Sequence, residues 1–121
     1  MNIKHITEIS EGNKVITLIN VFTVEPQNQE RLVKVLEKAT EEVIQILPGF
    51  ISANIHKSLD GTRVANYAQW KSKGDFEAML QNPQAKEHLD EAFKISQPDP
   101  HLYEVVSIHH NQYHCHYNLQ W

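Results

Sequence analysis

The chain has 121 residues, of which 40 % are hydrophobic and 21 % charged, and its formal net charge is −4. These values are typical of one globular domain with a hydrophobic core, and the acidic excess argues against a dedicated nucleic-acid-binding protein. No apolar run approaches the roughly 20 residues of a membrane-spanning helix, and the N-terminus lacks the apolar core of a secretion signal. We therefore expect a cytoplasmic protein that binds neither nucleic acid nor a membrane.

The chain carries few of the motifs that identify an enzyme directly. The only cysteine, Cys115, excludes an internal disulfide, and there is neither a P-loop nor a glycine-rich dinucleotide motif. Histidine is the one unusual residue type, with eight copies. We expect a single domain over residues 1–121, with a core at about 14–108 and a polar C-terminal extension at 109–121.

The first predicted elements are a strand and a helix. Residues 15–24 (VITLINVFTV) are rich in β-branched side chains and predict a strand that ends at Pro26. Residues 28–47 repeat apolar side chains at spacings of three and four, as one face of a helix does. The residues of this stripe are Leu32, Leu36, Ala39, Val43 and Ile46. Pro48 and Gly49 end the helix.

A hairpin follows. Residues 50–57 and 62–70 predict two strands, and Asp60-Gly61 between them is a strong signal for a two-residue turn because glycine tolerates positive φ. If Leu59 pairs with Thr62, Ile55 lies opposite Asn66.

The last third of the chain predicts helices and one more strand. Ser72 can cap a short helix, and Asn82-Pro83 interrupts it and starts a further helix that runs to about Ile95. Residues 96–101 (SQPDPH) predict a loop, and 102–109 (LYEVVSIH) the last strand. The order β-α-β-β-α-β predicts the α+β class with a ferredoxin-like antiparallel sheet and the helices on one face.

The predicted register assigns the side chains to two faces of the sheet, because cross-strand partners share a face. The apolar face, which we expect beneath the helices, carries Ile51, Ala53, Ile55, Val64, Asn66, Ala68 and Trp70. The other face carries Ser52, Asn54, His56, Ala65, Tyr67 and Gln69. In the first strand, the bulkier alternate set is Ile16, Leu18, Asn20, Phe22 and Val24.

Asn20 and Asn66 each interrupt an apolar row on strands that are neighbours in this topology. A buried amide without partners costs on the order of 1–3 kcal/mol, so each asparagine is either satisfied within the protein or faces a ligand. Apolar walls with a few convergent polar groups are typical of a small-molecule site. Trp70 lies on the same face, roughly 13 Å beyond Asn66 by strand rise, where it either packs in the core or forms a flat wall for an aromatic ligand.

The segment from Pro48 to Leu80 resembles the antibiotic biosynthesis monooxygenase (ABM) domain. The resembling parts are Pro-Gly-Phe at 48–50, Ser-Leu-Asp-Gly at 58–61, Asn66-Tyr67, Trp70, Phe76, and His-Leu-Tyr-Glu-Val at 101–105. The resemblance implies a dimeric α+β barrel, in which two sheets meet face to face in a homodimer. It also implies oxidation of polycyclic aromatic phenols to quinones with O2 as co-substrate and with no flavin, haem or metal, in a cavity lined by the counterparts of Asn66 and Trp70.

This chemistry suggests roles for particular residues. A phenol or hydroquinone reduces O2 readily only after it loses its proton, so amide donors such as Asn66 can stabilise the oxyanion in a dry cavity. Asn20, Phe22 and Met79 are assigned to substrate binding. His88, near the apolar side of its predicted helix, is the candidate general base, although a solvated helix-edge histidine and deprotonation by water are alternatives.

Two other functions remain open at this point. Haem-degrading relatives in the same superfamily use a strand asparagine, a helix tryptophan and a helix histidine, which Asn20 and His88 match in part, whereas Met79 stands in place of the tryptophan. A dimeric small-molecule-binding domain without turnover is the second alternative. The C-terminal group of His109, His110, His114, Cys115 and His116 fits no strong zinc spacing, so we expect no metal site there.

Overall fold

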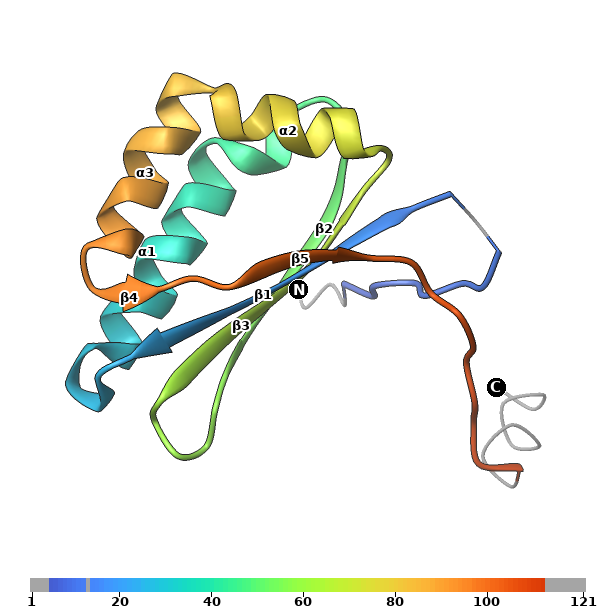
Figure 1. Ribbon diagram of the computed structural model, residues 1–121, viewed down its shortest axis with the longest axis horizontal. Helices are drawn as coiled ribbons and strands as arrows, with labels where there is room; N and C mark the ends of the chain where they lie inside the picture. Colours follow the sequence, from blue (N-terminus) through green and yellow to red (C-terminus); the bar gives the residue numbers. More distant parts are fainter. Residues whose placement is uncertain (1–4, 13, 113–121) are drawn as a thin grey trace. The chain divides into compact units, whose positions relative to one another are not determined.

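Residues Ile16–Val24 form strand β1, as their β-branched composition predicts, and this strand lies between β3 on one side and β4 and β5 on the other. The computed structural model (Figure 1) describes residues 5–12 and 14–112. After β1 come a 3₁₀ turn η1 (Pro26–Asn28), helix α1 (Gln29–Glu42), a second turn η2 (Ile44–Ile46), and strands β2 (Phe50–Lys57) and β3 (Arg63–Trp70). Helices α2 (Lys73–Gln81) and α3 (Pro83–Phe93) and the short strands β4 (Ser96–Gln97) and β5 (Pro100–Tyr103) complete the series.

The chain divides into two units. The larger, Lys14–Glu104, contains all of the elements named above. The smaller combines residues from both ends of the chain, and within it the backbone N–H of Ile108 donates to a carboxylate oxygen of Glu11 at 2.9 Å.

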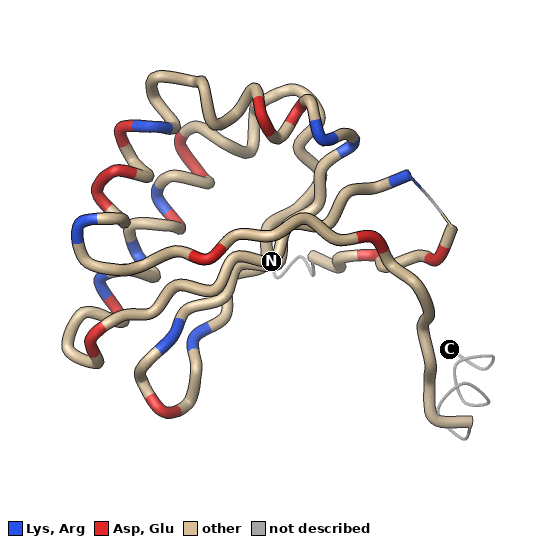
Figure 2. Tube along the Cα trace, viewed as in Figure 1, with Lys and Arg blue, Asp and Glu red and all other residues tan. Residues whose placement is uncertain are grey.

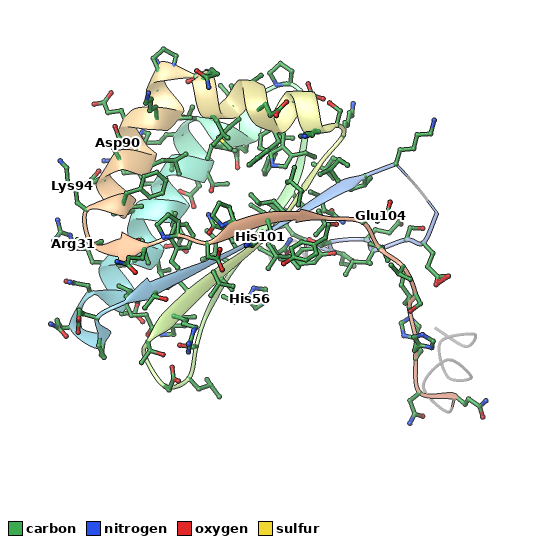
Figure 3. The ribbon with its side chains drawn as sticks, in the orientation of Figure 1. Arg31, His56, Asp90, Lys94, His101 and Glu104 are labelled. Carbon is green, nitrogen blue, oxygen red and sulfur yellow. The ribbon has the colours of Figure 1, made fainter. Side chains whose placement is uncertain are left out.

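The sheet is antiparallel, with the order β2-β3-β1, and both β4 and β5 pair with the free edge of β1. Figure 1 shows the three helices on one face of this sheet. The strands are almost free of charged residues, which gather on the helices and at the hairpin (Figure 2). Arg31, Asp90 and Lys94 lie at the outer edge of the helical layer (Figure 3). The expected ferredoxin-like α+β fold is therefore confirmed.

Local signals account for the helix boundaries. The Ser72 side chain accepts a hydrogen bond from the backbone N–H of Asp75 at 3.0 Å and so caps α2. The Asn82 side chain caps α3 by accepting from the N–H groups of Gln84 and Ala85, and Pro83 occupies the first turn, where its missing N–H costs nothing. The predicted break between the two helices is thus confirmed.

Two residues expected in the core are exposed. Ile46 is 78 % exposed, because α1 ends at Glu42 and the following 3₁₀ turn shifts the angular phase of the apolar stripe. Ile51 is 42 % exposed, because a bulge between Phe50 and Ser52 pairs Phe50, in place of Ile51, with Trp70. Beyond the bulge the predicted hairpin register is confirmed, with Ile55 opposite Asn66.

The predicted last strand at 102–109 is wrong in both position and length. The last strand of the structure is β5, Pro100–Tyr103. The short strand β4 precedes it, in the segment that was expected to be a loop. Tyr103 pairs with Thr17, so the next partner would be Ile16, where β1 begins. Pairing therefore stops because the neighbouring strand ends. The hairpin turn is likewise longer than two residues, with β2 ending at Lys57 and β3 beginning at Arg63.

Candidate active site

A pocket of about 220 Å³ lies between the helical layer and the sheet. Its wall on the sheet side comes from β1, β2, β3 and β5, and its wall on the helix side from α1, α2 and α3. Most of the lining is apolar, and its polar side chains are Asn20, Thr40, Asn66 and Trp70. This is the composition that small-molecule sites usually have.

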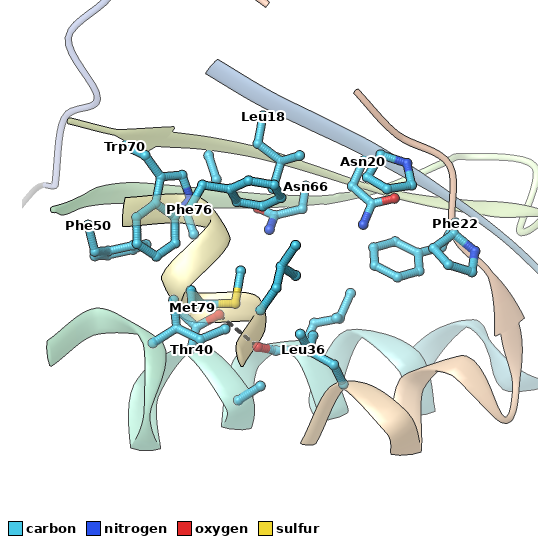
Figure 4. Close-up of a pocket in the computed structure, with 18 of the residues that line it drawn as sticks. Leu18, Asn20, Phe22, Leu36, Thr40, Phe50, Asn66, Trp70, Phe76 and Met79 are labelled. Carbon is cyan, nitrogen blue, oxygen red and sulfur yellow. Dashed lines mark hydrogen bonds between the residues drawn. The ribbon is translucent and has the colours of Figure 1, made fainter. Parts of the chain in front are cut away.

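Asn20 and Asn66 are direct cross-strand partners between β1 and β3. Opposed residues in an antiparallel pair have Cβ atoms about 4.5–5.5 Å apart, so the two amides lie side by side on one face. Figure 4 shows their nitrogen atoms pointing into the space between sheet and helices. The predicted convergence of the two asparagines on a pocket is confirmed.

The amide of Asn20 is held in one orientation. Its Oδ1 accepts a hydrogen bond from the backbone N–H of Asp99 at 3.0 Å. A backbone N–H can only donate, so the oxygen must face Asp99 and the Nδ2 group must face the other way, toward the pocket. Asn20 therefore presents a fixed hydrogen-bond donor at this site.

Two other polar atoms of the pocket have no hydrogen-bond partner among the residues that the structure describes. They are Asn66 Oδ1 and Trp70 Nε1, and both are buried. Most buried polar side-chain atoms in proteins are paired, and leaving one unpaired costs about 1–3 kcal/mol. A ligand would satisfy both by donating from a hydroxyl group to Asn66 Oδ1 and by accepting at an oxygen atom from the Trp70 Nε1–H group.

Trp70 is both a core residue and part of the pocket wall. It is 1 % exposed and packs edge-on between Phe50 and Phe76, with ring centroids 5.4 and 6.2 Å away. These two neighbours fix the plane of the indole ring against the pocket. Trp70 is therefore a core residue that also lines the pocket, and its contact with an aromatic ligand stays a prediction.

Phe22 and Met79 also line the pocket, as expected, and are 2 % and 6 % exposed. Thr40 contributes methyl surface, because its hydroxyl donates to the carbonyl oxygen of Leu36 at 2.8 Å within α1 (Figure 4). Phe50, Phe76 and Leu102 complete the inner wall, and their roles follow from register and helix packing, which the sequence pattern did not resolve.

His88 does not line the pocket, although the sequence made it the candidate general base. It faces α1 from α3, with its Nε2 atom 3.9 Å from a carboxylate oxygen of Glu42. Its side chain is 20 % exposed. His88 is next to Leu89 in the sequence, and Leu89 does line the pocket. Successive residues of a helix point in different directions, so His88 faces the neighbouring helix.

His101 is a pocket residue that was not singled out as functional from the sequence. It pairs with Ile19, on the face of β1 opposite to Asn20, so its ring shares the outer face of the sheet with Tyr103, 6.4 Å away. Its Nε2 atom lies 2.8 Å from Asp99 Oδ1. His101 and His56 both lie on strands, and their side chains are on the face of the sheet opposite Asn20 and Asn66 (Figure 3). Neither ring therefore supplies a base inside the pocket.

The described part of the chain, residues 5–12 and 14–112, holds no cluster of three or more metal-ligating side chains. His114, Cys115 and His116 lie outside the described residues. Within the same ranges, no helix is long and apolar enough to cross a membrane.

The family model for antibiotic biosynthesis monooxygenases matches residues 15–91, which contain both asparagines and Trp70. The chain belongs to this family. The tetracenomycin-F1 monooxygenase of Streptomyces glaucescens is 44 % identical over 98 residues, covering 81 % of this chain and 88 % of that protein. The expectation of a monooxygenase is thereby confirmed at the level of the family.

Solved structures of two other proteins are similar in fold. A monooxygenase from the gene ActVA-Orf6 of Streptomyces coelicolor, in complex with nanaomycin D, has a TM-score of 0.71 and 27 % identity, covering 80 % of this chain and 92 % of that one. SnoaB, a cofactor-independent oxygenase from Streptomyces nogalater, has a TM-score of 0.63 and 20 % identity, covering 78 % and 96 %. At that lower identity, the second likeness concerns the fold alone.

Proposed function

We propose that this ABM protein is a cofactor-independent monooxygenase that oxidises an aromatic phenol or hydroquinone, small or polycyclic, with O2 in the pocket described above. The observation that carries the proposal is the pair of adjacent amides, Asn20 and Asn66, beside the rigid aromatic face of Trp70. Planar apolar walls and two neighbouring amides suit a flat aromatic molecule that carries an oxygen substituent.

The reaction balances without an external electron donor. Conversion of a phenol to a quinone replaces a ring C–H by C=O and removes the phenolic O–H, which releases four electrons. Reduction of one O2 takes up four electrons, so that one oxygen atom enters the ring and the other leaves as water. No electrons from a flavin or metal are required by this stoichiometry.

The two amides stabilise the negative charge on the substrate oxygen. The phenolate that reduces O2 carries its charge on oxygen, and Asn20 Nδ2 is already oriented toward it by Asp99. Asn66 supplies the second polar contact from the neighbouring strand. Donors fixed in place before the reaction stabilise developing charge without the cost of reorientation. The amide pair is therefore the proposed oxyanion site.

The other walls hold the ring and exclude water. Trp70, Phe22 and Met79 are almost fully buried, so a ring among them is shielded from solvent during the radical step. No acidic, lysine or arginine side chain is found among the described residues that line the pocket. The proton of the phenol therefore passes to water at the open side of the pocket, before the ring is enclosed.

The relatives support an aromatic substrate. The S. glaucescens relative is named for tetracenomycin F1, and the S. coelicolor structure contains nanaomycin D. We propose that this chain takes a compound of the same chemical class as these two. His88, assigned as the base from sequence, has no part in the proposed reaction because it faces Glu42.

The test is O2 consumption by purified, EDTA-treated protein with 9-anthrone and 1-naphthol. We expect one O2 consumed per quinone formed, incorporation of one atom from ¹⁸O2, and no accumulation of hydrogen peroxide. In Asn66→Ala we expect kcat to fall about 10²–10³-fold with a smaller change in KM, because an oxyanion donor acts mainly in the transition state.

The matched control is Asn28→Ala, at an asparagine that lies before α1 and outside the pocket lining. Full activity of a folded Asn66→Ala protein would contradict the role of the amide. Binding of phenols without O2 uptake would favour a non-catalytic binding domain. A sharp haem Soret band at micromolar affinity would instead favour the haem-degrading alternative.

A further inference from the structure

Strands β4 and β5 pair with the same edge of β1 in one register (Figure 1). Thr23 pairs with Gln97, and three residues away along each strand Asn20 pairs with Pro100. The pairing is interrupted at residues 98 and 99. β4 and β5 are therefore two parts of one strand, with a break beside Asn20.

The break changes the hydrogen bonding of Asp99. The register, continued across the break, places Asp99 opposite Val21, and the Val21 N–H group donates to the Asp99 carbonyl oxygen over a long 3.5 Å. In a regular antiparallel pair of this kind, the Asp99 N–H group would donate back to the Val21 carbonyl oxygen. It donates instead to Asn20 Oδ1, at 3.0 Å. A backbone donor of the sheet is thus diverted to a side chain that lines the pocket.

Pro98 and Pro100 lie on either side of Asp99. A proline ring holds φ near −65°, whereas a regular antiparallel strand needs about −140°. The residue before a proline is restricted as well, and Asp99 precedes Pro100. Because hydrogen-bonded and non-hydrogen-bonded pairs alternate along a ladder, the backbone nitrogen atoms of both prolines face away from β1. The two prolines therefore disturb the strand geometry at Asp99 and remove no donor that β1 uses.

We propose that Pro98 and Pro100 are positioning residues for the reaction. They turn the Asp99 N–H group out of the ladder and onto Asn20, and so fix the amide that faces the substrate. The Asp99 carboxylate takes no part, because it lies on the opposite face of the sheet, with one oxygen 2.8 Å from His101 Nε2. The inference rests on the proposed function for the role of Asn20, but its first test needs no turnover.

The first experiment detects the hydrogen bond itself. In ¹³C,¹⁵N-labelled protein, NMR scalar couplings across hydrogen bonds identify the acceptor of the Asp99 N–H group, and we expect Asn20 Cγ in the wild type. In Pro98→Ala/Pro100→Ala, alanine can adopt the φ of a strand, so the coupling should move to the Val21 carbonyl carbon. The order parameter of Asn20 Nδ2 should then fall from about 0.85 to below about 0.6.

The second experiment asks whether the prolines act through Asn20. With 9-anthrone, kcat of the double variant should fall about 10-fold, less than the roughly 10²–10³-fold cost of a lost donor, because the amide still spends part of its time in the productive orientation. In an Asn20→Ala background, the same two substitutions should change kcat by less than about twofold. The urea unfolding midpoint should stay close to that of the wild type, because the ladder gains the hydrogen bond that Asn20 gives up.

Pro83→Ala is the matched control, because Pro83 lies in the first turn of α3 and outside the pocket lining. It should leave both the coupling and kcat unchanged. Pro100→Ala alone takes the place of the double variant if the latter does not fold, with the same expected change of acceptor.

Two results would overturn the inference. One is an Asp99 coupling that stays on Asn20 Cγ in the proline variants, and the other is an equal loss of kcat with and without Asn20. If no phenol is oxidised, the proposed function fails, and the coupling alone still decides whether the prolines position Asn20.

Discussion

Asn20 and Asn66 are paired directly across β1 and β3, so that the sheet itself brings two amides to one point of the pocket. The pair is asymmetric. Asn20 Oδ1 accepts from the backbone of Asp99, whereas Asn66 Oδ1 is buried without a partner among the described residues. One amide is therefore locked as a donor, and the other is free to respond to the ligand.

This asymmetry predicts a specific effect of Asn20→Asp. One carboxylate oxygen would accept from Asp99 as Oδ1 does, and the other would then face the pocket in place of Nδ2. Repulsion of a phenolate by this charge should lower kcat/KM by at least the 10²–10³-fold that loss of an oxyanion donor typically costs. Steady-state kinetics against Asn20→Ala measure the difference. Near-normal turnover in Asn20→Asp would show that the assigned orientation is wrong.

Two substitutions of Trp70 should differ in their effects on stability and on ligand binding. Trp70→Ala removes a ring that is 1 % exposed between Phe50 and Phe76, and should lower the free energy of unfolding by about 3–5 kcal/mol. Trp70→Phe keeps an aromatic wall, so it should lose less stability and retain affinity for planar ligands. Urea unfolding and anaerobic ligand titration would test both. The prediction fails if the two variants behave alike.

Gly49 is predicted to tolerate no side chain. It adopts φ +81°, and a Cβ atom there would collide with the side chain of Asp75, which takes part in the cap of α2. Gly61 has a similar φ of +82° but only an ordinary contact with Pro26. We expect Gly61→Ala to cost about 1–2 kcal/mol from backbone strain and Gly49→Ala to cost more, because the cap is also disturbed. Chemical denaturation of the two variants provides the comparison, and equal losses would contradict it.

Asp60 should contribute to a pH-dependent loss of stability in acid. Hydrogen bonds from the Thr62 hydroxyl and backbone N–H, and then from the Ser58 hydroxyl, lower the pKa of Asp60 to about 2. Because the folded pKa lies below the unfolded value, this contribution is present above about pH 4 and is lost as the pH falls toward 2. An NMR titration should show the low pKa in the wild type and a higher one in Thr62→Val. An unchanged titration in the variant would refute the assignment.

We predict a homodimer formed through the sheet face opposite the helices. This face carries Ser52, whose hydroxyl donates to Gln69 at 2.8 Å, and Asn54, whose amide donates to the Tyr67 carbonyl at 3.1 Å. Light scattering should give about twice the chain mass of 14.0 kDa, and Tyr67→Lys should shift the protein toward the monomer. A monomeric wild type at micromolar concentration would contradict the prediction.

The sequence by itself determined the order of elements from β1 to α3, the hairpin register beyond the bulge, the cap at Ser72, the helix break at Asn82-Pro83 and the face shared by Asn66 and Trp70. Each of these depends on signals within a few residues, namely the period of apolar side chains and the conformational preferences of glycine, proline and capping residues. The same short-range logic placed Asn20 on the pocket side of its strand.

Only the tertiary structure decided the features that depend on segments distant in the chain. The bulge after Phe50 exposes Ile51, the start of β1 ends the pairing of β5 at Tyr103, and the packing of α3 against α1 turns His88 toward Glu42. The orientation of Asn20 is set by a backbone group 79 residues away, at Asp99. Periodicity gives the direction in which a side chain leaves its own element, but what it meets there depends on how the elements pack.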